Sequence, residues 1–119
     1  MKKIYIRAKN FEVEAEILEK EVQKTTQAIW SALPFEAKVE IWKEEIYFDI
    51  SVKIQIEKPT SSTKAGDVSY WPDGPAFCIF YGSSQPISPV ETFARIKDGI
   101  EKFRDLKTGD WITVKRSRE

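Results

Sequence analysis

The most informative segment of the sequence is Gly66-Asp-Val-Ser-Tyr-Trp-Pro-Asp-Gly-Pro-Ala-Phe-Cys-Ile-Phe-Tyr-Gly82. Two β-prone runs, Val68–Trp71 and Ala76–Tyr81, flank the sequence Pro-Asp-Gly-Pro. Proline presets φ for the first corner of a turn and glycine supplies a positive φ at the far corner, so these four residues predict a tight turn. The second run has no polar alternation, which indicates a strand buried on both faces. The segment therefore predicts a hairpin in the core of a β-rich protein.

Alternating apolar residues predict six further strands on the two sides of this hairpin. They cover Ile4–Ala8, Phe11–Ile17, Phe35–Ile41, Ile46–Ile56, Phe93–Ile96 and Trp111–Lys115. The run Ile46–Ile56 is long for a single strand, so we expect it to bend. Together with the hairpin, the pattern predicts eight strands.

Two segments have helical spacing instead. The first runs from Val22 to Leu33 and ends at Pro34, which cannot continue a helix. The second is short, with Asp98 as its expected cap and an end near Gly109. Eight strands with so few helices favour a mainly β protein whose sheet closes into a barrel, because closure removes exposed strand edges.

Length and charge limit the classes of function. A chain of 119 residues predicts a single domain, residues 1–119. Its 19 basic and 19 acidic residues give a net charge of zero. A neutral chain has no electrostatic drive toward nucleic acid or anionic membranes, so we expect neither as a partner.

Residue usage indicates compartment and temperature. A single cysteine excludes an internal disulfide, residues 1–7 lack the apolar core expected of a signal peptide, and no apolar run approaches the ~18 residues of a membrane span. We therefore expect a cytoplasmic protein. Charged residues make up 32% of the chain, which has one asparagine, one methionine and no histidine, a composition typical of thermophilic proteins.

The second half of the chain resembles the cyclophilins. Gly74–Ile79 is similar to their Gly-Ser-Gln-Phe-Phe-Ile, and Thr92–Ile100 is similar to their Val-Phe-Gly-Lys-Val-Lys-Glu-Gly-Met. A closer resemblance is to a family of small prokaryotic proteins with a cyclophilin-like barrel and no assigned activity. Its members show Trp-x-Glu-Glu-Ile-Tyr-Phe, here Trp42–Phe48, and Gly-Asp-Val-Gly-Tyr-Trp-Pro-Pro-Gly, here Gly66–Gly74. The resemblance implies an eight-stranded, closed cyclophilin-like barrel with two flanking helices.

The isomerase site of true cyclophilins is not carried over. Those enzymes need an arginine that hydrogen-bonds the proline nitrogen, and no arginine occurs between Arg7 and Arg95. The pocket histidine is absent, and Ala76 stands where the cyclophilin motif has glutamine. We therefore expect the barrel without prolyl isomerase activity.

Few residues suit covalent, metal or nucleotide chemistry. Without histidine, Ser–His and Cys–His pairs are impossible and the commonest metal ligand is missing. Cys78 lies among apolar residues and is expected to be an inert core thiol, while Asp67 and Asp73 are typical turn-formers. Gly66 and Gly82 lack the spacing of a phosphate loop. We expect no metal and no cofactor.

Aromatic residues of the two family motifs predict a binding cleft. Its expected walls combine apolar area with polar groups and are Trp42, Glu45, Tyr47, Tyr70, Trp71 and Phe80. Strand neighbours point to opposite faces, so Glu44 and Glu45 should not form a catalytic pair. For the same reason at most one of Tyr70 and Trp71 is core, and the other should border a concavity shared with Glu45 or Tyr47.

Three functions remain open at this point. The first is binding of a small molecule or short peptide in the aromatic cleft. The second is an enzyme, either prolyl isomerase-like or an acid-assisted hydrolase using Glu45 or Asp67, and the third is a subunit role through an exposed sheet face. Several carboxyl groups with raised pKa in the cleft would favour an enzyme, an apolar cleft would favour binding, and a flat apolar patch would favour assembly. The sequence leaves the oligomeric state open.

Overall fold

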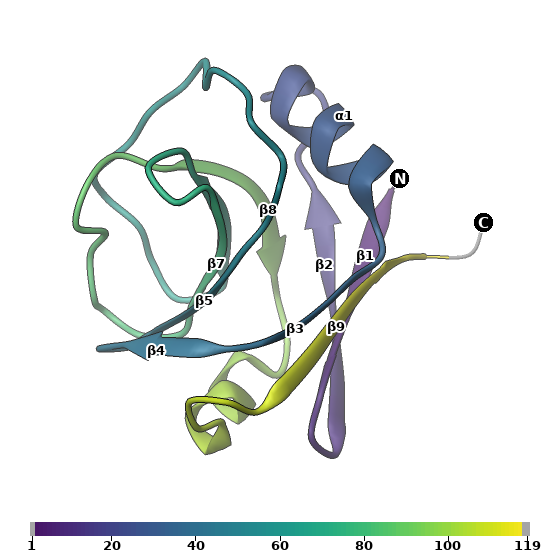
Figure 1. The fold of residues 1–119 in the computed structure, drawn as a ribbon, viewed down its shortest axis with the longest axis vertical. Helices are drawn as coiled ribbons and strands as arrows, with labels where there is room; N and C mark the ends of the chain where they lie inside the picture. Colours follow the sequence, from purple (N-terminus) through teal and green to yellow (C-terminus); the bar gives the residue numbers. More distant parts are fainter. Residues whose placement is uncertain (1, 118–119) are drawn as a thin grey trace.

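The computed structural model describes residues 2–117, which form one antiparallel sheet of nine strands curled into a barrel (Figure 1). The strand order is β3-β9-β1-β2-β8-β6-β7-β5-β4. The strands are β1 (Lys3–Ala8), β2 (Phe11–Ile17), β3 (Phe35–Lys38), β4 (Glu40–Trp42), β5 (Glu45–Asp49), β6 (Asp67–Trp71), β7 (Ala76–Phe80), β8 (Glu91–Ile96) and β9 (Trp111–Arg116). The prediction of a mainly β barrel is confirmed.

One continuous stretch of chain, from β3 through Val39 to β4, joins the two edges of the sheet and nearly closes the barrel. β3 pairs with β9 at one edge of the sheet, and β4 pairs with β5 at the other. Val39, between β3 and β4, donates its N–H to the carbonyl of Asp110 at 2.9 Å and accepts the N–H of Gly109 at 2.9 Å. The predicted strand Phe35–Ile41 is thus two strands, because it changes partner at Val39. The count is nine strands rather than eight for this reason.

The prediction of one long strand over Ile46–Ile56 is wrong. β5 ends at Asp49, and residues 50–57 belong to no strand. Their apolar side chains still pack against the core while the polar ones between them are exposed. The Tyr70 hydroxyl donates to the carbonyl of Val52 at 2.8 Å and accepts the N–H of Ile54 at 3.3 Å. The alternation therefore reflects burial of one side of the segment. Hydrogen bonds from the Tyr70 side chain, rather than strand pairing, hold the segment in place.

Two helices lie on opposite sides of the barrel (Figure 1). α1 (Gln23–Ala32) ends just before Pro34 as predicted and buries Thr25, Thr26 and Ile29. The second is a 3-10 helix, η1 (Ile100–Asp105). Its N-cap residue is Gly99, which has φ +89° and provides no side-chain cap. Asp98 is therefore not the cap. Within residues 2–117, neither helix is long and apolar enough to cross a membrane.

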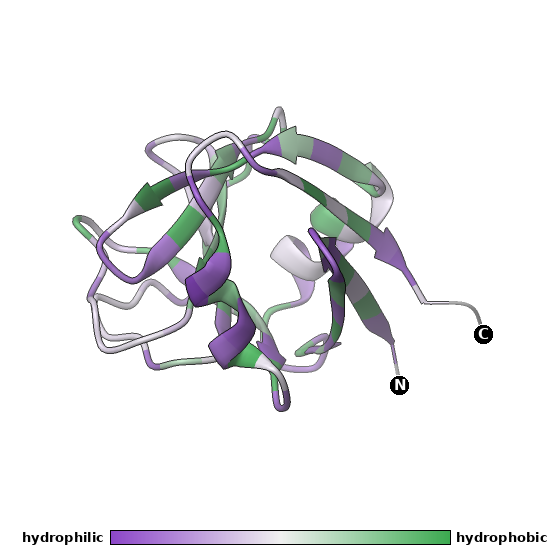
Figure 2. Ribbon diagram, turned by 90° about the horizontal axis from the view of Figure 1, so that it is seen from below, coloured by the Kyte–Doolittle hydropathy of each residue, from purple (hydrophilic) through white to green (hydrophobic). Residues whose placement is uncertain are grey.

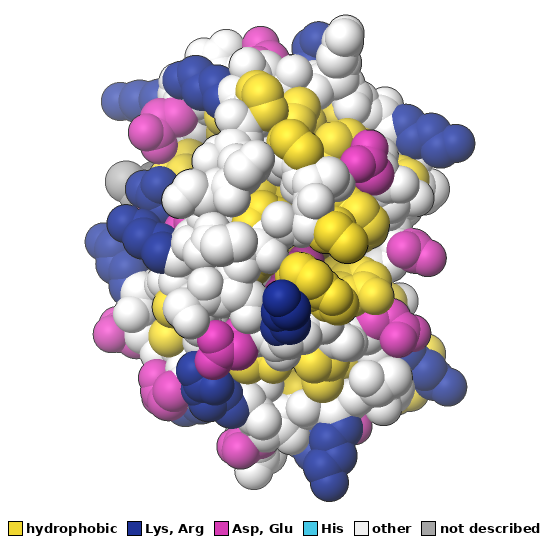
Figure 3. Space-filling model, turned by 90° about the vertical axis from the view of Figure 1, so that its left-hand side faces the viewer, with side chains coloured by type: hydrophobic (Ala, Val, Ile, Leu, Met, Phe, Trp, Pro, Cys, Tyr) yellow, Lys and Arg dark blue, Asp and Glu magenta, His cyan; other side chains and the backbone are white. Residues whose placement is uncertain are grey.

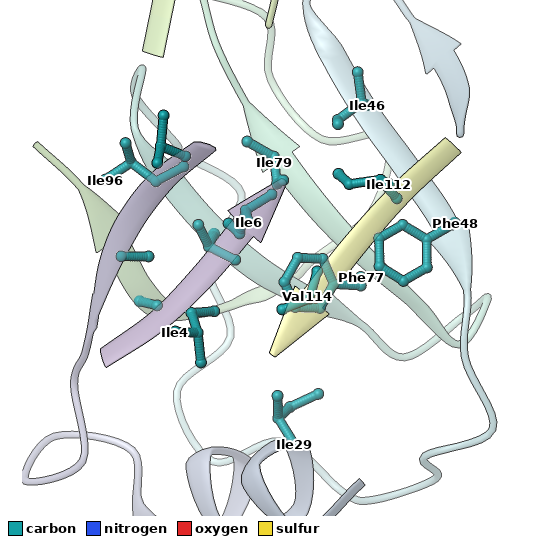
Figure 4. Close-up of a cluster of buried hydrophobic side chains, with 14 of the residues drawn as sticks. Ile4, Ile6, Ile29, Ile46, Phe48, Phe77, Ile79, Ile96, Ile112 and Val114 are labelled. Carbon is teal, nitrogen blue, oxygen red and sulfur yellow. The ribbon is translucent and has the colours of Figure 1, made fainter. Parts of the chain in front are cut away.

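Aliphatic and aromatic side chains fill the barrel. Hydrophobic and hydrophilic residues alternate along the strands, as Figure 2 shows. Phe77 of β7 stacks on Phe48 of β5 with ring centroids 5.0 Å apart and meets Phe93 of β8 edge-on at 5.6 Å. Ile29 points from α1 toward this core, and Ile6 and Ile79 approach it from two strands (Figure 4).

The β6–β7 hairpin forms as predicted, but its turn works differently. Trp71 pairs with Ala76, so residues 72–75 connect the strands. Gly74 does not take a positive φ, and the Gly74–Pro75 peptide is cis. A Cβ at Gly74 would lie 2.8 Å from the backbone nitrogen of Ala76, so close packing requires glycine here. Every residue of β7 is buried, as its unbroken apolar sequence predicts.

Candidate functional site

β7 is covered on both of its faces, and the cover on the outer face forms the candidate site. Phe77 and Ile79 point into the barrel, whereas Ala76, Cys78 and Phe80 form a separate apolar cluster. Tyr47 and Trp71 pack against this outer cluster. An antiparallel strand usually places polar residues on its outer face, so an apolar outer face calls for a cover. The loop of residues 82–90 supplies part of it.

A pocket opens to solvent between this loop and the strands. Its volume is about 130 Å³, and its lining is mainly aromatic and aliphatic: Trp42, Glu45, Tyr47, Trp71, Pro86, Ile87 and Val90. Figure 3 views the molecule from this side, where hydrophobic side chains gather in a band with acidic and basic side chains mostly around it. The volume approaches that of an apolar cavity of about 150 Å³ that holds benzene.

Strand alternation positions the polar members of the pocket. Glu45 and Tyr47 are two residues apart on β5, so both lie on its outer face. Trp42 of β4 is the pairing partner of Glu45. Trp71 ends β6 and pairs with Ala76 at the other side of β7. The two sequence motifs that predicted the cleft therefore contribute four residues to a single pocket.

Two of the six expected cleft residues lie elsewhere. Tyr70 is only 1% exposed and belongs to the barrel interior, where its hydroxyl hydrogen-bonds the backbone of residues 52 and 54. Its neighbour Trp71 takes the outer face, as strand alternation requires. Phe80 is fully buried beneath Tyr47 and Trp71 in the outer cluster and does not line the pocket. Tyr70 is thus not a cleft residue, and Phe80 is a support beneath the cleft.

The carboxyl group of Glu45 is the charged group of the pocket. The residue is 7% exposed, and burial raises its pKa, while a hydrogen bond from the Cys78 thiol acts in the opposite direction. Burial and the neighbouring Glu45 carboxylate raise the pKa of Cys78 well above its usual range. The thiol therefore stays protonated and is a weak donor rather than a nucleophile. Among residues 2–117, no lysine or arginine forms an ion pair with Glu45.

Glu44 has a different environment from its neighbour. Its carboxylate accepts the N–H of Ser83 at 2.9 Å and pairs with the Arg104 guanidinium at 2.8 Å. These contacts, the Ser83 N–H first, lower the pKa of Glu44. A Cβ at Gly82 would overlap the Glu44 carboxyl group, so glycine allows this close approach. The two adjacent carboxyl groups thus have separate roles, and Glu44 anchors the start of the loop that forms the pocket wall.

Hydrogen bonds hold the rest of this loop, residues 82–90 (the wall loop), in place. The Gln85 side chain accepts the N–H of Thr63 at 2.7 Å and donates to its carbonyl at 2.9 Å. The indole N–H of Trp71 donates to the Ser88 hydroxyl at 2.6 Å, which donates to Asp73 at 2.7 Å. The pocket is therefore fixed on both sides before any ligand binds, which lowers the entropy cost of binding.

Sequence reasoning missed the loop side of the pocket. Residues 83–89 read as a plain loop because prolines and serines dominate them. The signal was Ile87, an aliphatic residue that no strand or helix pattern explains and that is 72% exposed at the pocket. Pro86 and Val90 lie on either side of it. Which loop covers a sheet face depends on the three-dimensional path of the chain.

Asp67 lies outside the pocket. Its carboxylate pairs with Arg95 at 3.3 Å and accepts the N–H of Lys64 at 3.1 Å, so it closes the turn before β6. Over residues 2–117, no three histidine, cysteine, aspartate or glutamate side chains are placed to hold a metal ion together. Neither observation adds a second acidic group to the pocket around Glu45.

Comparison with known proteins places the fold. The model of the cyclophilin-like family matches residues 2–115. The solution structure of the hypothetical protein AF2241 from Archaeoglobus fulgidus is 31% identical, with a TM-score of 0.82 over 97% of this chain and 94% of that one. The structure of McbB in complex with tryptophan is 14% identical, with a TM-score of 0.80 over 98% of this chain but 45% of that one, and it shows the fold alone. No curated protein matches the sequence. The chain belongs to the cyclophilin-like family.

Proposed function

We propose that this protein is a binding module that holds a small molecule in the pocket over the outer face of β7. The observation that carries the proposal is a fixed aromatic pocket with one buried carboxyl group, Glu45. Several carboxyl groups of raised pKa would have favoured an enzyme, whereas an apolar cleft favours binding. The pocket is hollow rather than flat, which argues against a surface used only for assembly.

The size of the pocket favours a small molecule over a peptide. A volume of about 130 Å³ accommodates one ring or one branched group and is too small for several side chains. McbB, which shares the fold, was solved in complex with tryptophan. That likeness supports the class of ligand by analogy with the fold and does not identify the ligand.

An acid-assisted enzyme is the second candidate, favoured by Glu45 itself. A carboxyl group whose pKa burial raises is suited to act as a general acid. The only other titratable lining residue is Tyr47, whose pKa burial also raises. Among the described residues that line the pocket, Glu45 is the one carboxylic acid, and Asp67, the other acid considered, pairs with Arg95 outside the pocket. Binding without turnover is therefore the stronger proposal.

The four tryptophans provide a direct test. Trp42 and Trp71 line the pocket, whereas Trp30 and Trp111 lie outside it. A fragment library is titrated into ¹⁵N-labelled protein, and the indole N–H signals are assigned with single Trp→Phe variants. We expect bound fragments to shift the signals of Trp42 and Trp71 and to leave those of Trp30 and Trp111 in place. Fragments that shift all four signals equally, or none, would contradict the proposal.

Thermostability and the absence of nucleic-acid binding remain predictions from composition. We propose an unfolding midpoint above the mesophilic range of roughly 45–65 °C, to be measured by calorimetry. A midpoint within that range would reject the thermophilic interpretation. Zero net charge predicts no retention on a nucleic-acid column at physiological salt.

A further inference from the structure

Building on the proposed small-molecule function, we propose that the pocket recognises a substituted ammonium group, held between Trp42, Tyr47 and Trp71 with Glu45 as its counter-ion. Nothing in the family likeness supplies this ligand class. It follows from how the aromatic and charged groups of the pocket are partnered within the chain.

The aromatic lining suits a compact cation. Indole and phenol rings attract cations through the negative potential of their faces, and several rings around one cavity are the usual receptor for quaternary ammonium groups. Trp42, Tyr47 and Trp71 come from three different strands and converge on one pocket of about 130 Å³. A trimethylammonium group fits a space of that size.

Trp71 differs from the other tryptophans in its partners. A basic side chain lies over each of the other three indoles: Lys43 is 4.8 Å from the Trp42 ring centroid, Lys38 is 5.5 Å from that of Trp111, and Lys2 and Arg116 lie over Trp30. Within residues 2–117, no lysine or arginine lies over Trp71. Its N–H is fixed by Ser88, so the ring is oriented and its face is available to a ligand.

The charge of the pocket has no oppositely charged partner inside the described chain. Over residues 2–117, Glu45 makes no ion pair, and no lysine or arginine is among the pocket-lining residues. Its protein partner is the Cys78 thiol, which is a weak donor. The residue lines a pocket that is open to solvent, and a cationic ligand there would supply the opposite charge that the described chain does not.

Other ligand classes satisfy the pocket less well. An anion would meet the Glu45 carboxylate without any basic lining residue to offset the repulsion. A neutral apolar ligand would fill the space but bury Glu45 further without a partner. A primary ammonium is strongly hydrated and needs several acceptors, whereas an alkylated ammonium presents apolar surface to the rings. The combination of three aromatic residues with one carboxylate therefore favours the alkylated cation.

The test compares a cation with its neutral isostere. Choline chloride and 3,3-dimethyl-1-butanol, which has carbon in place of the ammonium nitrogen, are titrated by calorimetry at matched ionic strength. We expect choline to bind at least about tenfold more tightly. Glu45→Gln should weaken choline about 5- to 30-fold and leave the alcohol within twofold. Glu36→Gln, which removes an exposed carboxylate of β3 outside the pocket, is the matched control and should change choline affinity less than twofold.

Substitutions of the tryptophans distinguish cation binding by the aromatic rings of the pocket from a general effect on packing. Trp71→Ala should weaken choline about 5- to 30-fold, and Trp71→Phe, which keeps a ring in the outer cluster, about 2- to 5-fold. Trp111→Phe, at a tryptophan that is 57% exposed and outside the pocket, should have no effect. A short trimethyllysine peptide is titrated in parallel. Binding tighter than choline would assign the cation to a peptide and overturn the small-molecule ligand.

The outcomes distinguish this inference from the proposed function. Equal binding of choline and the alcohol, with Trp42 and Trp71 signals shifted by both, would overturn the cation preference and leave small-molecule binding intact. A choline affinity that changes less than twofold in both Glu45→Gln and Trp71→Ala would place the site elsewhere and overturn the inference. Binding of neither probe overturns the inference; if the fragment library also leaves all four indole signals unmoved, the proposed function fails with it.

Discussion

Two buried glutamates differ in the partners that the chain gives them. Glu91, at the start of β8, is 0% exposed and accepts the N–H groups of Glu57 at 2.8 Å and Lys58 at 2.5 Å, together with the Thr25 hydroxyl. Glu45 is almost as buried but has the Cys78 thiol as its partner. Glu91 thus has three hydrogen-bond donors from the chain, whereas Glu45 has one weak donor and lines a pocket that opens to solvent. We infer that Glu91 serves the fold and Glu45 serves a ligand.

The position of Glu91 explains an unusual part of the barrel. Residues 50–57 pack their apolar side chains against the core without pairing in the sheet, and their far end is held by the carboxyl group of Glu91. The same carboxyl group reaches Thr25 on α1. One side chain thus joins a strand, a helix and an unpaired segment. Glu45, in contrast, has its hydrogen-bond partner, Cys78, within the same sheet, and it lines the pocket.

Substitution of Glu91 should have the largest effect on stability. Glu91→Ala leaves two backbone N–H groups and the Thr25 hydroxyl without their acceptor, and we expect it to lower the free energy of unfolding by about 3–5 kcal/mol. Glu91→Gln keeps one acceptor oxygen and should cost about 1–2 kcal/mol. Urea unfolding measures both. A loss below about 1 kcal/mol for the alanine variant would remove the distinction between the two glutamates.

The wall loop offers an intermediate effect. Gly82→Ala would force the Glu44 carboxyl group away from Ser83 and Arg104, and we expect a loss of stability smaller than that of Glu91→Ala, because the end of the Glu44 side chain can move aside. The double variant Gly82→Ala/Glu44→Ala removes the overlapping group. It should be no less stable than Glu44→Ala alone in chemical denaturation. Additive losses in this cycle would show that Gly82 is not needed for the approach of Glu44.

Glu45→Gln should have the smallest effect, and of opposite sign. Burial raises the pKa of Glu45 in the folded protein, so ionisation of this group destabilises the fold. That penalty is absent below the unfolded glutamate pKa of about 4.3 and grows as pH rises through the folded pKa. Glutamine, which does not ionise, should therefore raise stability by about 0.5–1 kcal/mol at pH 7 and leave it unchanged near pH 3. Thermal unfolding across this range measures the difference. Destabilisation at pH 7 would show that the carboxylate has a favourable partner in the protein.

The sequence predicted the local features of the site better than its enclosure. Alternation along β5 correctly set Glu45 and Tyr47 on one face, because side-chain direction in a strand has a period of two. Adjacent residues take opposite faces, but the pattern alone did not tell whether Tyr70 or Trp71 was the outer one. Ile87 joined the pocket through a loop whose path depends on Glu44, Gln85 and Ser88 contacts. Such contacts between distant segments leave no periodic signal.

The strand prediction had the same limit. Apolar alternation over residues 46–56 correctly predicted which side chains face the core. It did not predict that pairing stops at Asp49, since Tyr70 and Glu91 replace the missing strand partner from elsewhere in the sequence. At Val39 the alternation continues while the strand partner changes from β9 to β5. The periodicity of apolar residues indicates which side chains are buried, whereas the pairing of strands depends on the topology of the fold.

A carbon-13 titration of the glutamate side-chain carboxyl signals compares the charges of the pocket and its wall within one sample. Glu45 should titrate above the ordinary glutamate pKa because of burial, and Glu44 below it because of the Ser83 N–H and Arg104. Cys78 acts on the pKa of Glu45, and Glu45, Glu40 and Asp49 all lie near Tyr47. Lys43 lies over the Trp42 ring of the same pocket, but within residues 2–117 it makes no ion pair with Glu45. Saturating choline should lower the pKa of Glu45 and leave that of Glu44 unchanged. A Glu45 pKa at or below the ordinary value in the free protein, unmoved by choline, would contradict the account of an unpaired carboxylate that awaits a cationic ligand.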